Sequence, residues 1–170
     1  MKRLSIFFFY DGDGIVDRYI DCFLQELKKN SEHLLVVCNG KLEPEGEKLI
    51  RKSADDLLIR ENKGFDIWAY KSGLEYLTWE KVAQYDELVL CNFTCFGPLY
   101  PFAEMFEKMS AKDVDFWGIT KFNKVDYDPF GTVVYNYLPD HLQSNFLVAR
   151  KKLFTSREYQ KRPLRPLWKW

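Results

Sequence analysis

Arg60, Asn62, Gly64 and Asp66 occupy alternate positions of one polar segment, which joins an apolar stretch to a helical pattern. An arginine can bind a phosphate group through two hydrogen bonds, and a glycine lets the backbone approach a ligand closely. The helix that follows would offer free N–H groups and the positive end of its dipole to an anion. These residues therefore predict a phosphate-binding loop, although Asn62 and Asp66 could instead only cap the helix.

A second polar segment, Asn92-Phe93-Thr94, follows the apolar residues 87–91. Amide and hydroxyl oxygens are weak, neutral ligands for a divalent cation, which prefers carboxylates. Asn92 and Thr94 therefore predict at most a weak site for Mn²⁺ or Mg²⁺. The alternative is a polar strand end whose side chains only satisfy backbone groups.

Asp11 opens a third polar segment, Asp11-Gly12-Asp13-Gly14, after the apolar residues 4–10. It resembles the nucleophile motif of haloacid-dehalogenase-like phosphatases, in which the first aspartate attacks phosphorus and the second acts as acid or base. Two other interpretations stay open: a tight turn whose aspartates cap the following helix, and a loop that contacts a nucleotide. Asp11 is therefore a candidate substrate-binding residue.

Three further side chains have types suited to proton transfer or ligand contact. Asp115 precedes an apolar stretch and, with Asp66, is a candidate general base, although a solvated acid at a strand start is the alternative. His141 closes a long polar segment and could serve as a catalytic residue, a metal ligand or a substrate contact, or be structural. Gln143 and Ser144 follow it as candidate substrate-binding residues.

Alternating apolar and amphipathic segments would position these residues. Short apolar runs predict buried strands, and apolar residues at spacings of three and four predict helices. This alternation predicts a mostly parallel sheet with helices on both faces, in an α/β domain. Residues 146–148 predict a late, antiparallel strand, and residues 121–142 a long loop. We expect strands at 4–10, 34–38, 57–59, 87–91 and 114–119, and helices at 15–29, 45–53, 65–77 and 99–109.

Composition limits the class of protein. The 170 residues predict a single domain, with a core over residues 1–150 and a basic, aromatic tail over residues 151–170. Lys plus Arg and Asp plus Glu number 25 each, which argues against nucleic-acid binding. The four cysteines form no Cys-x-x-Cys pair, and neither a signal peptide nor a membrane span is visible, so we expect a cytoplasmic protein. Residues 161–170 could contact an anionic membrane surface, or form a plain exposed tail.

Several of these segments together resemble the rhamnan synthesis protein F family, in order and over nearly the whole chain. The resemblance implies a GT-A-like nucleotide-binding fold and a glycosyltransferase role in the synthesis of a rhamnose-containing cell-surface polysaccharide or lipopolysaccharide. It also implies dTDP-rhamnose as donor and a glycan or lipid-linked glycan at the inner membrane face as acceptor. The segments that carry it are residues 60–66, 91–99, 115–120 and 141–144, with residues 9–27 and 36–39 also similar.

The resemblance assigns roles by position. Asn62, Gly64 and Asp66 would belong to the donor pocket, and Asn92 and Thr94 would lie at the position of an Asp-x-Asp metal motif. Residues 141–144 would border the sugar or the acceptor. Where the family commonly has Asn-Asp-Ser, this chain has Asn92-Phe93-Thr94. We therefore expect a nucleotide-sugar-binding domain, with a non-catalytic or truncated module of a polysaccharide assembly complex and a phosphatase that uses Asp11 as the alternatives.

Overall fold

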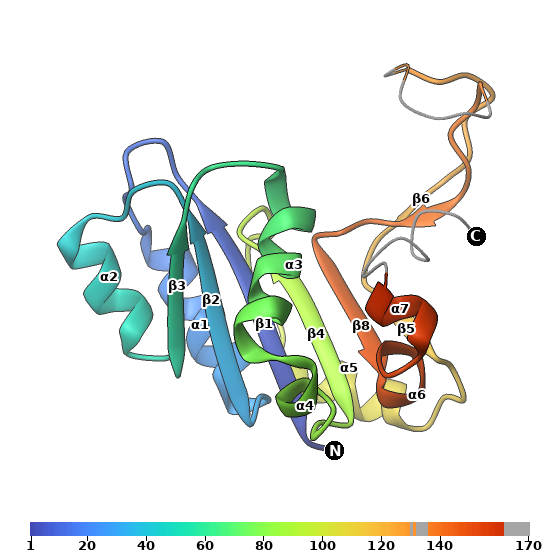
Figure 1. Cartoon of the computed structure of the whole chain (residues 1–170), viewed down its shortest axis with the longest axis horizontal. Helices are drawn as coiled ribbons and strands as arrows, with labels where there is room; N and C mark the ends of the chain where they lie inside the picture. The colour runs from blue at the N-terminus through green and yellow to red at the C-terminus, as the bar shows by residue number, and fades with distance from the viewer. Residues whose placement is uncertain (130, 132–135, 162–170) are drawn as a thin grey trace.

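A six-stranded sheet forms the centre of the protein, in a computed structural model that describes residues 1–129, 131 and 136–161. Its strands are β1 (Arg3–Tyr10), β2 (His33–Asn39), β3 (Asp56–Arg60), β4 (Glu87–Asn92), β5 (Phe116–Gly118) and β8 (Phe146–Arg150). Across the sheet they follow the order β3-β2-β1-β4-β8-β5 (Figure 1). The first four strands run parallel, and β8 is antiparallel to both β4 and β5.

Helices cover both faces of this sheet (Figure 1). One face carries α1 (Arg18–Lys29), α2 (Pro44–Arg51) and α5 (Phe102–Ser110). The other face carries α3 (Phe65–Leu77), α4 (Trp79–Val82), α6 (Lys151–Phe154) and α7 (Arg157–Lys161). None of the helices in the described ranges is long and apolar enough to cross a membrane.

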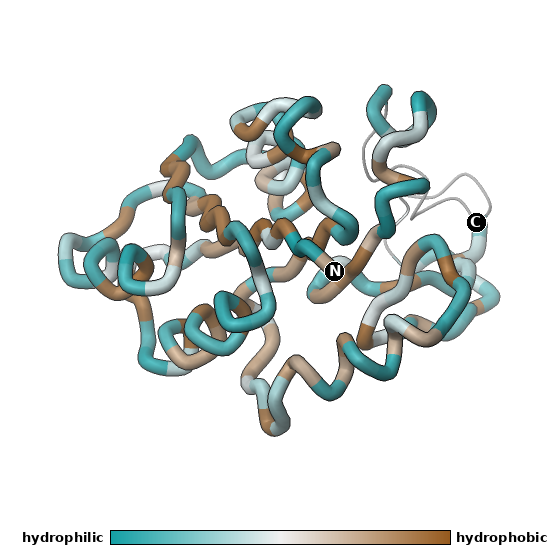
Figure 2. Tube along the Cα trace, turned by 90° about the horizontal axis from the view of Figure 1, so that it is seen from below, coloured by the Kyte–Doolittle hydropathy of each residue, from teal (hydrophilic) through white to brown (hydrophobic). Residues whose placement is uncertain are grey.

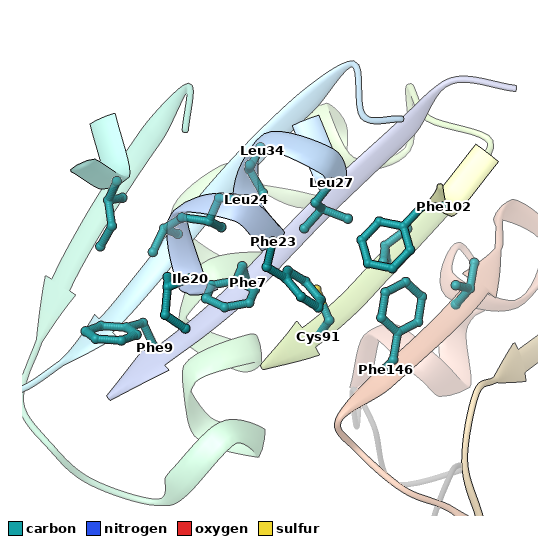
Figure 3. Packing of buried hydrophobic residues seen from close by; sticks show 14 of the residues in the cluster. Phe7, Phe9, Ile20, Phe23, Leu24, Leu27, Leu34, Cys91, Phe102 and Phe146 are labelled. Atoms are coloured by element: carbon teal, nitrogen blue, oxygen red, sulfur yellow. The ribbon is translucent and has the colours of Figure 1, made fainter. Parts of the chain in front are cut away.

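Strands β1, β2, β4 and β8 are largely apolar and buried, since helices cover both faces of the sheet there. Successive side chains of β1 point to opposite faces, so that Phe7 and Phe9 join the core beneath α1, while Ile6 and Phe8 join the core beneath α3. The rings of Phe7 and Phe23 lie with their centroids 5.3 Å apart (Figure 3). Hydrophobic residues accordingly follow the central strands, and hydrophilic residues gather on outer helix turns and loops (Figure 2).

The predicted α/β class, the mostly parallel sheet and the helices on both faces are confirmed. The late strand is also antiparallel, as predicted. Residues 121–142 are not simply a loop, because β6 (Lys121–Phe122) and β7 (His141–Leu142) pair as a small antiparallel sheet.

The predicted tail over residues 151–170 is wrong for its first part. Residues 151–161 form α6 and α7, and their side chains Phe154 and Tyr159 are completely buried in the core beneath α3. Residues 162–170, on which the predicted membrane contact rests, lie outside the described residues.

Because β1 to β4 run parallel, the side of the sheet where these strands end differs from the side where they begin. The carboxyl ends of β1, β2, β3 and β4 meet at one edge, and because β8 is antiparallel, the segment that precedes β8 comes to the same edge. In open α/β sheets, ligands bind outside the carboxyl ends of the parallel strands. We refer to this side of the sheet as the carboxyl edge.

Candidate functional site

Arg60, at the end of β3, is held at the carboxyl edge by two hydrogen bonds from its Nη1 group. One goes to Asn39 Oδ1 at 2.8 Å and the other to the Lys63 carbonyl oxygen at 3.1 Å. Its Nη2 and Nε atoms make no hydrogen bond within the described part of the chain. Arginine carries five N–H donors, so this side chain can still bind an anion through the other side of its guanidinium group.

Asn39 was missed by the sequence analysis, although it stands at the end of β2 and is completely buried. Its side chain accepts the Arg60 hydrogen bond and donates to Asn62 Oδ1 at 3.4 Å. Asn39 therefore connects two predicted site residues. The signal that could have found it is a polar residue that directly follows a buried strand.

The turn before α3 depends on Gly64. Its φ of +75° lies in the left-handed region, and a Cβ atom there would lie 2.2 Å from Trp68 Cγ. The next residue, Phe65, also has a positive φ of 54° and keeps 84% of its surface exposed. Gly64 thus allows the sharp entry into α3 that brings Asp66 against the end of β4.

Asp66 and Asn92 contact each other directly. Asn92 Nδ2 donates to Asp66 Oδ2 at 3.2 Å, and the backbone N–H of Ile67 donates to Asp66 Oδ1 at 2.8 Å. The Asn92 side-chain oxygen accepts from the Thr94 backbone N–H at 3.1 Å and from Thr94 Oγ1 at 2.6 Å. A carboxylate, an amide and a hydroxyl group from α3, β4 and the following loop are therefore connected.

Tyr70 lies beneath this group and was not singled out in the sequence. The ring is completely buried, and its hydroxyl donates to the Ser144 carbonyl oxygen at 2.9 Å. Burial raises the pKa of Tyr70 well above its usual value, and a hydrogen bond with the Asn92 side chain opposes that rise. The Tyr70 hydroxyl is therefore neutral and ties α3 to the segment before β8.

Backbone and side-chain hydrogen bonds hold residues 143–145 at the carboxyl edge. The Gln143 N–H donates to the Thr120 carbonyl oxygen at 3.0 Å, and Thr120 Oγ1 donates to Asn145 Oδ1 at 2.7 Å. The Asn145 carbonyl oxygen accepts the Asn92 N–H at 3.1 Å. Gln143 is exposed, so it is the member of this segment whose side chain is most accessible to a ligand.

Asp11 has a local role in its own turn. Its Oδ1 atom accepts the backbone N–H groups of Asp13 and Ile15, both at 2.9 Å. The hydrogen bond from Ile15 is the main cause of the lowered pKa of this carboxyl. The carboxylate therefore stabilises the tight turn after β1, but it does not cap α1, which begins at Arg18 without a side-chain cap hydrogen bond.

Two candidate catalytic residues lie elsewhere. Asp115 precedes β5 at the opposite edge, where its carbonyl oxygen accepts the Arg150 N–H and its carboxylate pairs with Lys152 at 3.3 Å. His141 lies in β7, outside the six-stranded sheet, where its ring stacks on Phe122 and Nδ1 donates to the Pro139 carbonyl oxygen at 2.8 Å. The structure therefore brings Asp66, but not Asp115, to the carboxyl edge.

The donor set at Asn92 and Thr94 does not fit a divalent cation. Both lone pairs of the Asn92 oxygen are used by Thr94, and the carboxylate in contact with this pair is Asp66 alone. Mg²⁺ and Mn²⁺ select carboxylate and carbonyl oxygens that are available for ligation. Across the described residues, no three His, Cys, Asp or Glu side chains come together as a possible metal site.

Comparison with known proteins decides the family. The sequence profile of the family RgpF, rhamnan synthesis protein F, matches residues 34–163. This chain belongs to the rhamnan synthesis protein F family. The matched region includes the carboxyl-edge residues Arg60, Asp66, Asn92 and Ser144.

Two further similarities were found. The virulence protein VirA of Vibrio anguillarum is 27% identical over 161 residues, which cover 91% of this chain and 50% of that protein. This chain thus spans about half the length of the curated relatives that it matches. A solved structure of core-mannan synthase A from Aspergillus fumigatus, in a Mn/GDP form, is similar over 95% of this chain and 62% of that chain, with a TM-score of 0.47 and 10% identity.

Proposed function

We propose that this rhamnan synthesis F-family chain is a glycosyltransferase-like domain that binds a nucleotide sugar for polysaccharide synthesis. The observation that carries the proposal is the carboxyl edge, where Arg60 and Asn62 both contact Asn39 at the end of β2, and Asp66 contacts Asn92 at the end of β4, with β1 between the two groups. A guanidinium group suits a diphosphate, and carboxylate and amide groups suit hydroxyl groups. The site therefore contains groups suited to both the charged and the neutral parts of such a ligand.

The finer parts of the proposal follow from the family. dTDP-rhamnose is the proposed donor, and a glycan or a lipid-linked glycan is the proposed acceptor. We place the reaction in the cytoplasm, at the inner membrane face, with the chain as a peripheral partner of that surface. Of the acids considered as a general base, Asp66 is the one at the carboxyl edge, and His141 remains a candidate contact to the acceptor.

A second function is favoured by one observation, the neutral and internally bonded Asn92–Thr94 pair. A chain that keeps the fold but lacks the chemistry would serve as a non-catalytic module of a polysaccharide assembly complex. Transfer or hydrolysis of the donor by the isolated chain would argue against this module. The third alternative, a phosphatase, finds no support in Asp11, since its carboxylate caps its own turn.

The test is a thermal-shift and calorimetry panel of dTDP-, UDP- and GDP-sugars. We expect one nucleotide sugar to stabilise the wild-type chain, by about 2.7 kcal/mol at 100 times its dissociation constant. Arg60→Ala should weaken that binding by about tenfold or more, because a charge-assisted contact to phosphate is lost. Arg51→Ala is the matched control, since Arg51 pairs with Glu47 on the surface of α2. The absence of any shift would favour the non-catalytic module.

A further inference from the structure

The side chain of Asn92 is buried, and its oxygen has no acceptor position left for a cation. A primary amide offers two acceptor lone pairs and two N–H donors. Thr94 uses both acceptor positions, and Asp66 accepts a hydrogen bond from Nδ2. The Asn92 oxygen could therefore ligate a cation only if it lost a hydrogen bond from Thr94.

Asp66 is the opposite case. Its carboxylate has about four acceptor positions, and the hydrogen bonds from Ile67 N–H and Asn92 Nδ2 occupy one on each oxygen. The side chain is half-buried, so the remaining positions can reach a ligand at the carboxyl edge. Two neighbouring acceptors on one carboxylate match two neighbouring hydroxyl groups, and O–H···O⁻ hydrogen bonds are among the strong ones.

We propose that Asp66 binds two adjacent hydroxyl groups of the nucleotide sugar without a metal ion, and that Asn92 is the residue that positions it. The inference rests on the proposed function and names the part of the ligand that Asp66 recognises. Adjacent hydroxyl groups occur in a ribose and in a hexose. The deoxyribose of a dTDP-sugar lacks such a pair, so with that donor the pair belongs to the transferred sugar.

The first experiment measures metal binding alone, by calorimetric titration of Mn²⁺ without nucleotide. Wild type should show no specific Mn²⁺ binding. Asn92→Asp should gain at least about tenfold in Mn²⁺ affinity, because it places a second carboxylate beside Asp66. A stoichiometric Mn²⁺ site in wild type that Asp66→Asn abolishes would overturn the proposal, and so would an Asn92→Asp chain that folds but gains no affinity.

The second experiment measures the affinities of dTDP-rhamnose and dTDP, in EDTA and in Mn²⁺. If the panel selects another donor, that nucleotide sugar and its nucleoside diphosphate replace them. Asp66→Asn keeps the shape of the side chain and should weaken binding of the nucleotide sugar by about tenfold or more, with the nucleoside diphosphate unaffected. Asp113→Asn, an exposed acid before β5, is the matched control and should change neither affinity.

The outcomes separate this inference from the function on which it rests. With dTDP-rhamnose and dTDP, equal losses for both ligands in Asp66→Asn would assign Asp66 to the nucleotide and overturn the hydroxyl contact; with a ribonucleotide donor, equal losses would assign the hydroxyl pair to the ribose. An unchanged affinity for the nucleotide sugar would overturn any ligand role for Asp66. If wild type binds no nucleotide sugar, the proposed function and the hydroxyl contact both fail, whereas the Mn²⁺ titration still decides whether Asp66 and Asn92 form a metal-free pair.

Discussion

Tyr70 and Tyr159 are both completely buried, but their hydroxyl groups meet different surroundings. The Tyr70 hydroxyl donates to the Ser144 carbonyl oxygen at 2.9 Å, whereas the Tyr159 hydroxyl finds no partner among the described residues. Tyr70→Phe should lower the free energy of unfolding by about 1–2 kcal/mol, because it leaves a partly buried carbonyl group without its donor. Urea unfolding at pH 7 measures this change.

Tyr159→Phe is the matched control for the same chemical change. Removing a buried hydroxyl that has no partner eliminates a desolvation cost without breaking a hydrogen bond, so stability should stay constant or rise slightly. Equal losses in the two variants would contradict the different roles that the structure assigns to these hydroxyl groups.

The entry into α3 depends on a glycine that alanine cannot replace without strain. A Cβ atom at Gly64 would lie 2.2 Å from Trp68 Cγ, and its φ of +75° disfavours any side chain. Gly64→Ala should therefore cost about 1–3 kcal/mol in urea unfolding. Gly12→Ala is the control, because its Cβ atom would meet nothing within 4 Å. Equal stability of the Gly64→Ala and Gly12→Ala variants would contradict the role that the close contact and the positive φ give to Gly64.

Asp55 connects α1 to the strands β2 and β3, and its contribution depends on pH. Its carboxylate accepts Lys28 Nζ at 2.6 Å and the Leu34 N–H at 2.7 Å. Burial raises the pKa of Asp55, but these hydrogen bonds outweigh it, so that the net pKa is lowered. A lowered folded-state pKa stabilises the fold above the unfolded value of about 3.9 and loses this effect as the pH falls through the folded pKa.

Asp55→Asn should therefore be less stable than wild type at pH 7, by about 1 kcal/mol for a partly exposed pair. The difference should shrink below about pH 4, as first the unfolded-state carboxyl and then, at its lowered pKa, the folded-state carboxyl becomes protonated. Urea unfolding at pH 7 and pH 3 tests the sign. A difference that stays constant over this range would mean that the charge of Asp55 does not contribute.

The strands could be predicted because short, continuously apolar runs mark buried parallel strands, and their ends placed Arg60 and Asn92 at one edge. The prediction that Asp115 belongs to the site failed, because Asp115 precedes β5 and therefore lies at the edge opposite to the carboxyl edge. Because β8 runs antiparallel to β4, the residue before it, Asn145, lies at the carboxyl edge. Local sequence does not reveal the direction of a strand. α6 and α7 span four and five residues, too few to show a helical period, so residues 151–161 were mistaken for a tail.

At the scale of the whole molecule, the proposed ligand contacts lie at the carboxyl edge, and a buried ionic cluster lies at the opposite edge. Glu87 begins β4 and pairs with Arg3 of β1 at 2.7 Å and with Arg150 of β8 at 3.7 Å. Its side chain is 2% exposed, and those of the two arginines are 13% and 19% exposed. This cluster joins three neighbouring strands, including the antiparallel β8, at a distance from Asp66.

Glu87→Gln keeps the shape of this side chain but leaves two largely buried arginines without their counter-charge. Stability should fall by about 3 kcal/mol or more, and Tm by about 2–4 °C for each kcal/mol in a domain of this size. Glu47→Gln is the control, because its exposed pair with Arg51 on α2 is expected to contribute about 0.5 kcal/mol or less. Ligand affinity, measured well below Tm, should be unchanged in both variants, since the cluster stabilises the sheet without touching the site. A loss of affinity in folded Glu87→Gln would instead show that β4 transmits changes from one edge to the other.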